Sequence, residues 1–264
     1  MDTQTLILAV AVGVGIGLLL GLLGGGGSIL TVPALVYILG QDVSTSAATS
    51  LIIVGSNAAI GAGLHYSSGR VRWRTSLVFG LAGLVGALPG AKLNHMLPGS
   101  LVLLLFAGVM VLAAVFMLRR KMISTHAVES DCSSRRYCVT SLIAGTGVGF
   151  LTGFFGVGGG FLIVPALVGA LYLSMPQAVA TSLAIIALNS ISGLVGHVLF
   201  GHVELGLALP LIAGGGAGIA LGAVLAGRVP EAGLRKMFAL LLVVLALFLA
   251  VQNGPAALRF LGYI

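Results

Sequence analysis

GLLGGGGSILTVPAL, residues 21–35, returns 132 residues later as GFFGVGGGFLIVPAL, residues 153–167. The match extends without a gap from residues 21–99 to residues 153–231, with 28 identical pairs in 79 positions. Each copy places a glycine cluster inside a long apolar run. Two interrupted helices in a duplicated membrane protein can meet at the repeat interface and bind a small solute, so the pattern predicts a transporter.

The composition indicates lipid as the surrounding of this chain. Of its 264 residues, 58% are hydrophobic and only 7% are charged, whereas soluble domains carry about 25% charged residues. The net charge of +7 does not indicate nucleic acid, because the basic residues gather in a few short loops, as they do on the cytoplasmic side of membrane proteins. The N-terminus has no basic region before its apolar run, so no removed signal peptide is expected.

Apolar runs of about 20 residues are long enough to cross the hydrocarbon core as helices. The chain has eight runs of this kind or longer, at residues 5–39, 44–65, 75–97, 99–118, 139–172, 176–200, 205–227 and 233–251. The runs 5–39 and 139–172 are too long for one straight crossing, and each contains a glycine cluster that disfavours helix. We therefore expect each of these two runs to form a helix, a break and a shorter helix.

The predicted fold is an all-α polytopic membrane protein of two inverted repeats, each a glycine-broken helical hairpin followed by three transmembrane helices. If both long runs double back, eleven basic residues share one side and only Lys92 and Arg259 lie opposite; if each run crosses once, the split is 9 to 4. The first arrangement obeys the positive-inside rule better. It predicts an inner-membrane, multi-pass protein with both termini outside the cytoplasm. Residues 1–120 form the first repeat, 121–137 a cytoplasmic linker and 138–264 the second repeat of one membrane domain.

The glycine clusters are the first candidate binding site. Glycine lets backbone N–H groups point freely, and the start of the helix after each cluster offers unpaired donors and partial positive charge to an anion. The candidate substrate-binding residues are Gly24, Gly25, Gly26, Gly27, Ser28, Gly156, Val157, Gly158, Gly159 and Gly160. The alternative is that glycines only permit tight helix packing. That is the preferred interpretation of isolated pairs such as Gly13/Gly17 and Gly218/Gly222.

A polar stripe follows each cluster at helical spacing. It carries further candidate binding residues, namely Thr49, Ser50 and Asn57 in the first half and Thr181, Ser182 and Asn189 in the second. These hydroxyl and amide groups could donate to an oxyanion, or they could only join helices by hydrogen bonds. His65 and His197 end the two stripes and are candidates for proton coupling, with an interfacial position as the alternative.

Several classes of protein are not expected. No Asp or Glu lies within a predicted span, which argues against a metal or cation site built from carboxylates. Cys132 and Cys138, near His126, lack the spacing of a zinc site and read as incidental thiols. The chain also lacks a nucleotide-binding loop and a nucleophile–base set, so we expect no cofactor, no metal and no enzymatic activity.

The two Gly-x-x-Gly-x-Gly-Gly-x-x-x-x-Val-Pro-Ala-Leu segments, with Ala-Thr-Ser-Leu at 48–51 and 180–183, resemble the sulfite exporter TauE/SafE family over nearly the whole chain. The resemblance implies a secondary transporter, an exporter of a small sulfur-containing anion such as sulfite or an organosulfonate. The halves differ in one respect, since Gly25 and Ser28 correspond to Val157 and Gly160.

Two alternatives to this function stay open. One is a permease for another small anion such as thiosulfate, and the other is a non-transporting membrane scaffold. The expected partners are a small anionic substrate and the lipid bilayer, without nucleic acid. The oligomeric state stays open, a homodimer included.

Overall fold

The computed structural model describes residues 3–41, 43–66, 69–94, 96, 99–119, 135–155, 160–198 and 204–260, and most of these residues are helical. The first half contains α1 (Thr3–Leu23), a 3-10 turn (Gly24–Gly27), α2 (Ser28–Pro33), a π turn (Ala34–Ile38), α3 (Val43–Tyr66), α4 (Trp73–Asn94) and α5 (Gly99–Arg119). The second half contains α6 (Arg135–Phe155), α7 (Gly160–Ala170), α8 (Met175–Val198), α9 (Leu205–Arg228) and α10 (Glu231–Phe260). The helices follow the predicted apolar runs closely, although α6 begins inside the predicted linker.

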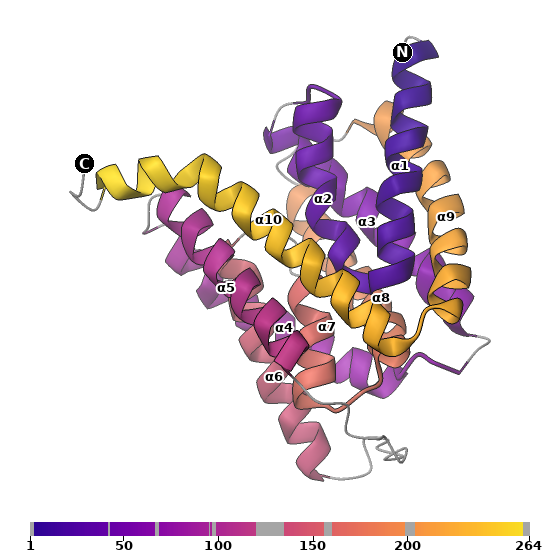
Figure 1. Ribbon diagram of the computed structural model, residues 1–264, viewed down its shortest axis with the longest axis vertical. Coiled ribbons are helices and arrows are strands. Elements are labelled where there is room, and N and C mark those ends of the chain that lie inside the picture. The colour runs from indigo at the N-terminus through magenta and orange to yellow at the C-terminus, as the bar shows by residue number, and fades with distance from the viewer. Residues whose placement is uncertain are drawn as a thin grey trace.

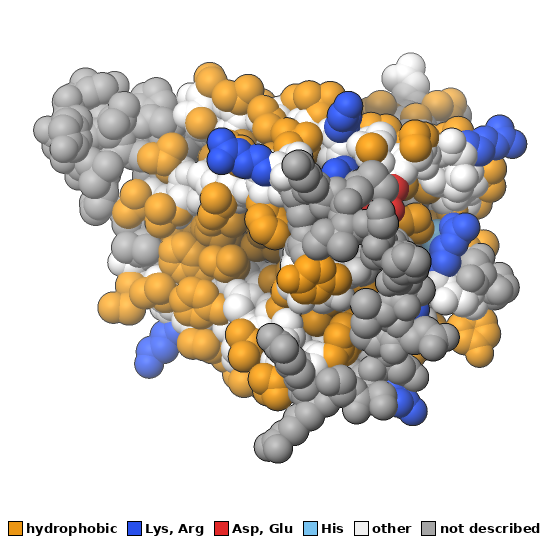
Figure 2. All heavy atoms as spheres, turned by 60° about the horizontal axis from the view of Figure 1, so that its bottom comes forward, with side chains coloured by type: hydrophobic (Ala, Val, Ile, Leu, Met, Phe, Trp, Pro, Cys, Tyr) orange, Lys and Arg blue, Asp and Glu red, His pale blue; other side chains and the backbone are white. Residues whose placement is uncertain are grey.

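The fold is that of a polytopic membrane protein, as predicted. Six of the described helical segments are long and apolar enough to cross a membrane, at Thr3–Ile38, Trp73–Leu93, Leu101–Arg119, Tyr137–Phe155, Leu205–Arg228 and Glu231–Gln252. Large apolar side chains point outward from several of them, and Figure 2 shows hydrophobic side chains over much of one face with few charges among them. Helices suit this setting because they satisfy every backbone hydrogen bond internally where no water is present.

The long segment Thr3–Ile38 folds back on itself at the glycine cluster (Figure 1). A methyl group added to Gly27 would lie 2.6 Å from the Leu20 nitrogen and 2.8 Å from the Ile16 carbonyl oxygen. In a straight helix, residues 16 and 27 would be about 16 Å apart. Gly24 makes the reversal with a left-handed φ of +68°, which glycine adopts without strain. The helix, break and shorter helix predicted for the first half are therefore present.

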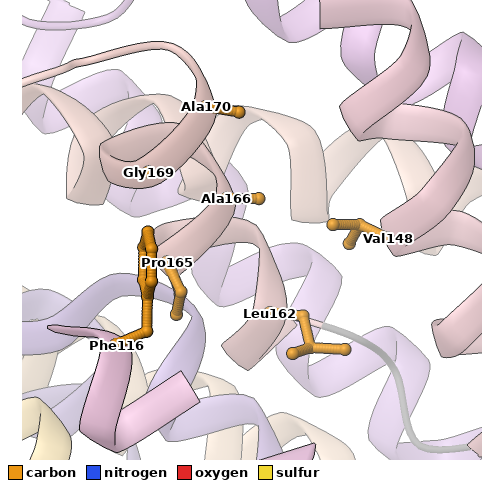
Figure 3. A pocket seen from close by; sticks show the side chains of 7 residues that line it. All are labelled: Phe116, Val148, Leu162, Pro165, Ala166, Gly169 and Ala170. Carbon is orange, nitrogen blue, oxygen red and sulfur yellow. The ribbon is translucent and has the colours of Figure 1, made fainter. Parts of the chain in front are cut away.

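The second half returns in the same way between α6 and α7. Val148 of α6 lines one hollow together with Leu162 and Ala166 of α7, as Figure 3 shows. Residues 148 and 166 would lie about 27 Å apart in a straight helix. The chain therefore reverses between Phe155 and Gly160 here as well.

The helices pair across the two halves. α1 packs along α9, and α4 packs along α6. α3 packs against α8, and α5 lies beside α10 (Figure 1). The repeat offset relates α1 to α6, α3 to α8, α4 to α9 and α5 to α10. Exchanging these counterparts turns the α1/α9 pair into the α6/α4 pair and leaves the α3/α8 and α5/α10 pairs unchanged. The packing therefore follows the internal repeat of the sequence.

Two glycine seams join these pairs, one between α1 and α9 and one between α4 and α6. In the first seam, a methyl group on Gly13 would lie 2.6 Å from the Leu211 carbonyl oxygen, and one on Gly21 would lie 2.5 Å from that of Ile219. The counterparts Gly145, Gly149 and Gly153 of α6 meet the α4 backbone in the same way. Gly17, Gly218 and Gly222 also belong to the first seam, so the packing interpretation of the isolated glycine pairs is confirmed.

Candidate functional site

The two glycine breaks meet in the interior of the protein. A methyl group on Gly25 would overlap the carbonyl oxygen of Gly160, the first residue of α7. A methyl group on Gly160 would in turn lie 3.1 Å from the Gly25 carbonyl oxygen and 2.5 Å from Ser28 Oγ. Gly24–Gly27 and Gly160 are all buried. The breaks therefore touch backbone to backbone, away from the lipid-facing surface. The candidates Gly156, Val157, Gly158 and Gly159 lie outside the described residues.

Side chains from neighbouring helices surround this contact. Ser182 Oγ would lie 2.5 Å from a methyl group on Gly24, and Ile186 Cδ1 would lie 2.9 Å from one on Gly160. Phe106 and Phe238 are counterparts at the 132-residue offset. Phe238 of α10 packs against the first break, while Phe106 of α5 contacts the aromatic rings on both sides of the second, with ring centroids 5.0 Å from Phe155 and 5.1 Å from Phe161. Each break is thus backed by an aromatic residue from the other half.

The serine hydroxyl groups at the breaks donate hydrogen bonds to carbonyl oxygens of their own half of the chain. Ser28 Oγ donates to the Gly25 carbonyl oxygen at 2.7 Å, and Ser182 Oγ donates to the Val179 carbonyl oxygen at 2.8 Å. Hollows of about 410 and 250 Å³ lie elsewhere and are lined mainly by apolar side chains, without any of the candidate binding residues. The described residues of the two breaks lie in direct contact, and none of them lines either hollow.

The polar stripe of α3 faces the interior. Ser50 and His65 are buried, and Asn57 is completely buried. Neither the oxygen nor the nitrogen of the Asn57 amide has a hydrogen-bond partner among the described residues, and the amide lies directly against Gly215 of α9. Asn189 Oδ1 on α8 is likewise buried and unpaired in the described part of the chain. An unpaired buried polar group costs about 1–3 kcal/mol, so the Asn57 amide can donate to or accept from a ligand, whereas the unpaired Asn189 oxygen can only accept.

The two threonines of the repeated Ala-Thr-Ser-Leu segment bind across the halves. Thr49 Oγ1 accepts a hydrogen bond from the Glu204 N–H at 3.3 Å, and Thr181 Oγ1 accepts one from the Arg72 N–H at 3.2 Å. The two bonds are counterparts, because the repeat offset relates Thr49 to Thr181 and Arg72 to Glu204. Each threonine therefore holds the residue just before α9 or α4. Sequence reasoning missed this role, since nothing local in the sequence pairs a helix with a loop more than 100 residues away.

The remaining candidates are histidine and cysteine side chains. His65 lies in the last turn of α3, with Nδ1 3.0 Å from the Gly61 carbonyl oxygen of the same helix. His197 belongs to α8, but its side chain lies outside the described residues, as do Cys132 and His126. Cys138 is half-buried. Among the described residues, no group of three or more His, Cys, Asp or Glu side chains could hold a metal ion.

Comparisons with known proteins agree with this architecture. Residues 9–249 match the family described as "Sulfite exporter TauE/SafE". A "Probable membrane transporter protein" of Xylella fastidiosa strain 9a5c is 34% identical over 251 residues, which cover 94% of this chain and 96% of the relative. The "Probable membrane transporter protein YdhB" of Bacillus subtilis is 28% identical over 83% of this chain and 89% of its own length. No solved structure matches the chain. With its duplicated glycine breaks and its membrane-spanning helices, the chain therefore belongs to the sulfite exporter TauE/SafE family and is a membrane transporter.

Proposed function

We propose that this transporter carries a small sulfur-containing anion, such as sulfite or an organosulfonate, out of the cell by alternating access in the inner membrane. The observation that supports this most is the contact between Gly25 and Gly160, which brings the two breaks to one buried point. Discontinuous helices that meet at a repeat interface are the usual solute site of such carriers.

The proposal includes an inverted relation between the two repeats. Its support comes from the counterpart helices α3 and α8, where Gly61 lies against Leu183 and Gly55 lies against Ser190. The residue numbers run in opposite directions, so the two helices are antiparallel, as an inverted repeat requires. With this inversion, the positive-inside rule assigns both termini to the outer side and the Arg70–Arg74 loop to the cytoplasm.

An anion would be held mainly by backbone amides. α7 begins at Gly160, and a helix N-terminus offers partial positive charge and N–H donors to an anion. Ser28, Ser182 and the unpaired Asn57 amide would add donors. The breaks have to part before an anion can enter, and the Ser28 hydroxyl would then exchange the Gly25 carbonyl for an anion oxygen. This parting and closing is the conformational change expected of alternating access.

A ligand screen followed by flux tests the proposal. The purified protein is heated with sulfite, an organosulfonate, thiosulfate, sulfate or chloride, because a ligand at 100 times its Kd stabilises by about 2.7 kcal/mol. Sulfite or the sulfonate should raise the Tm and should cross proteoliposome membranes in a saturable manner. A response to thiosulfate alone would reassign the substrate, while saturable binding of none of these anions would contradict the proposed substrate class.

A substitution in the break separates the site from general membrane insertion. Gly26→Leu should abolish sulfite flux but leave insertion intact, since the added side chain meets the flexible ends of Leu241 and Phe238. Gly15→Leu is the control, because Gly15 is exposed and an added methyl group there has no neighbour within 4 Å. Normal sulfite flux in Gly26→Leu would contradict the proposed site.

A further inference from the structure

Residues of opposite charge occupy equivalent positions in the two halves. Arg72 directly precedes α4 and Glu204 directly precedes α9, and the repeat offset of 132 relates them. Their backbone N–H groups make the two equivalent bonds to Thr181 and Thr49. The backbone is therefore repeated at these two places while the charge is reversed. Only six acidic residues occur in the whole chain, so a glutamate at this position is not a consequence of composition.

The Arg72 position adjoins the meeting point of the glycine breaks, and the Glu204 position is its counterpart in the repeat. Thr181, which binds Arg72, directly precedes Ser182, whose hydroxyl lies against Gly24. Thr49, which binds Glu204, holds the equivalent place before Ser50 on α3. Arg72 is thus bound next to the residue that contacts the first break, and Glu204 holds the equivalent position in the other half.

The two charges lie at opposite ends of the α3/α8 pair. These helices are antiparallel, with Gly61 against Leu183. Thr49 lies twelve residues before Gly61, whereas Thr181 lies two residues before Leu183. At 1.5 Å per residue, the two threonines are therefore about 20 Å apart along the helices, with the glycine breaks between them.

The Arg72 side chain is suited to meet an anion. Its Nε is buried and has no hydrogen-bond partner among the described residues. The turn that carries it is held by Ser76, whose Oγ donates to the Arg72 carbonyl oxygen at 3.1 Å. A guanidinium N–H without an acceptor is satisfied best by an oxyanion, through a charge-assisted hydrogen bond. Glu204 is exposed at its own end and repels the same ligand.

We infer that Arg72 and Glu204 give the transport pathway its polarity, with Arg72 drawing the anion to one mouth and Glu204 disfavouring its return at the other. This inference rests on the proposed function. In the orientation proposed above, the Arg72 mouth faces the cytoplasm, so anions are captured inside and released outside. The charges change the apparent affinity at each face, while the driving force still comes from the ion and substrate gradients.

The test measures the KM for sulfite from each face, in right-side-out and inside-out membrane vesicles. The wild-type KM should be lower at the Arg72 face. Arg72→Gln should raise the KM at that face about three- to tenfold, since a unit charge a few Å from the anion is lost. Glu204→Gln should lower the KM at its own face by a similar factor. Both changes keep the backbone N–H that binds the threonine.

Further variants make the test specific. The exchanged double variant Arg72→Glu/Glu204→Arg should reverse the asymmetry, and added salt should weaken every one of these effects. Arg228→Gln is the control, because Arg228 is an exposed basic residue of the same predicted face; its KM should stay within about twofold of wild type.

The failure of this inference can be told apart from failure of the proposed function. Transport with equal KM values at both faces, unmoved by Glu204→Gln, overturns the inference alone. If the wild-type protein carries none of the anions in the screen, the proposed function fails and the inference fails with it. Glu204 is exposed, so its variant gives a result even where Arg72→Gln does not fold.

Discussion

In the first half, Gly13, Gly17 and Gly21 of α1 pack against α9, and in the second half the equivalent glycines of α6 pack against α4. At the edges of the breaks the two halves differ, since Ser28 corresponds to Gly160 and Arg72 corresponds to Glu204. Along these seams the helix backbones touch and no side chain fits, so both halves have glycine there. At the breaks the counterparts differ, since Gly25 corresponds to Val157 as well, so the asymmetry of a transporter can arise there.

The largest effect is expected in the glycine seams. Gly17→Leu and Gly149→Leu would drive a side chain into the backbone of Gly215 and Gly83. Overpacking against side chains usually costs about 1–3 kcal/mol, and backbone cannot yield in the same way. We expect no monodisperse protein on size-exclusion chromatography in detergent.

The repeat itself supplies matched controls for the seam variants. Gly15 and Gly147 are counterparts, both are exposed, and an added methyl group at either has no neighbour within 4 Å among the residues that the structure describes. Gly15→Leu and Gly147→Leu should elute and melt like the wild type. A folded Gly17→Leu protein would show that the seam tolerates separation of its helices.

The next effect concerns the contact between the breaks. Gly25→Ala should push Gly160 away and reduce sulfite flux by more than about tenfold, which corresponds to about 1.4 kcal/mol of lost complementarity. Gly26→Ala is the neighbouring control, because its methyl group would meet side chains and no backbone, with Leu241 Cδ2 nearest at 3.1 Å. Both variants are checked by flux in proteoliposomes and by the Tm. Equal flux in the two variants would show that transport does not depend on the Gly25–Gly160 contact.

A third prediction distinguishes binding from packing at Asn57. Asn57→Leu removes a buried amide without partners in the described structure, so the Tm should stay equal or rise. If the amide binds the anion, the KM for sulfite should rise about 10- to 100-fold, as expected for hydrogen bonds to a charged group worth about 1.5–3 kcal/mol. A lower Tm with unchanged KM would assign Asn57 to packing alone. Asn189→Leu tests the equivalent position of the second half.

The smallest effect is expected at the turn before α3 and its counterpart before α8. Gly40 has a φ of +65°, and its counterpart Tyr172 has a φ of +57°. The left-handed conformation costs a non-glycine residue about 1–2 kcal/mol. Gly40→Ala should therefore lower the free energy of unfolding by about 1 kcal/mol, and Tyr172→Gly should raise it by a similar amount. Thermal melting checks both variants. A Tm change of the same sign in the two would contradict the claim that both positions have the same left-handed backbone conformation.

The helices and the breaks could be predicted because their causes are local. Runs of about 20 apolar residues determine where a helix crosses lipid, and clusters such as Gly24–Gly27 determine where it is interrupted. The internal repeat predicted that the breaks meet, and Gly25 does lie against Gly160. The roles of Thr49 and Thr181 could not be predicted, because a hydroxyl in a helix gives no sign of which distant N–H group it will reach.

Amino-acid order alone thus determined the membrane setting, the doubled architecture and the place of each interruption, all of which follow from hydropathy, glycine content and internal similarity. Only the folded chain decided that α1 pairs with α9, that Asn57 is buried against Gly215 without a hydrogen-bond partner in the described structure, and that Arg72 and Glu204 lie at opposite ends of one helix pair. The physical reason is that hydropathy acts on each segment separately. Contacts between segments more than 100 residues apart depend on which surfaces fit together once all helices are in place.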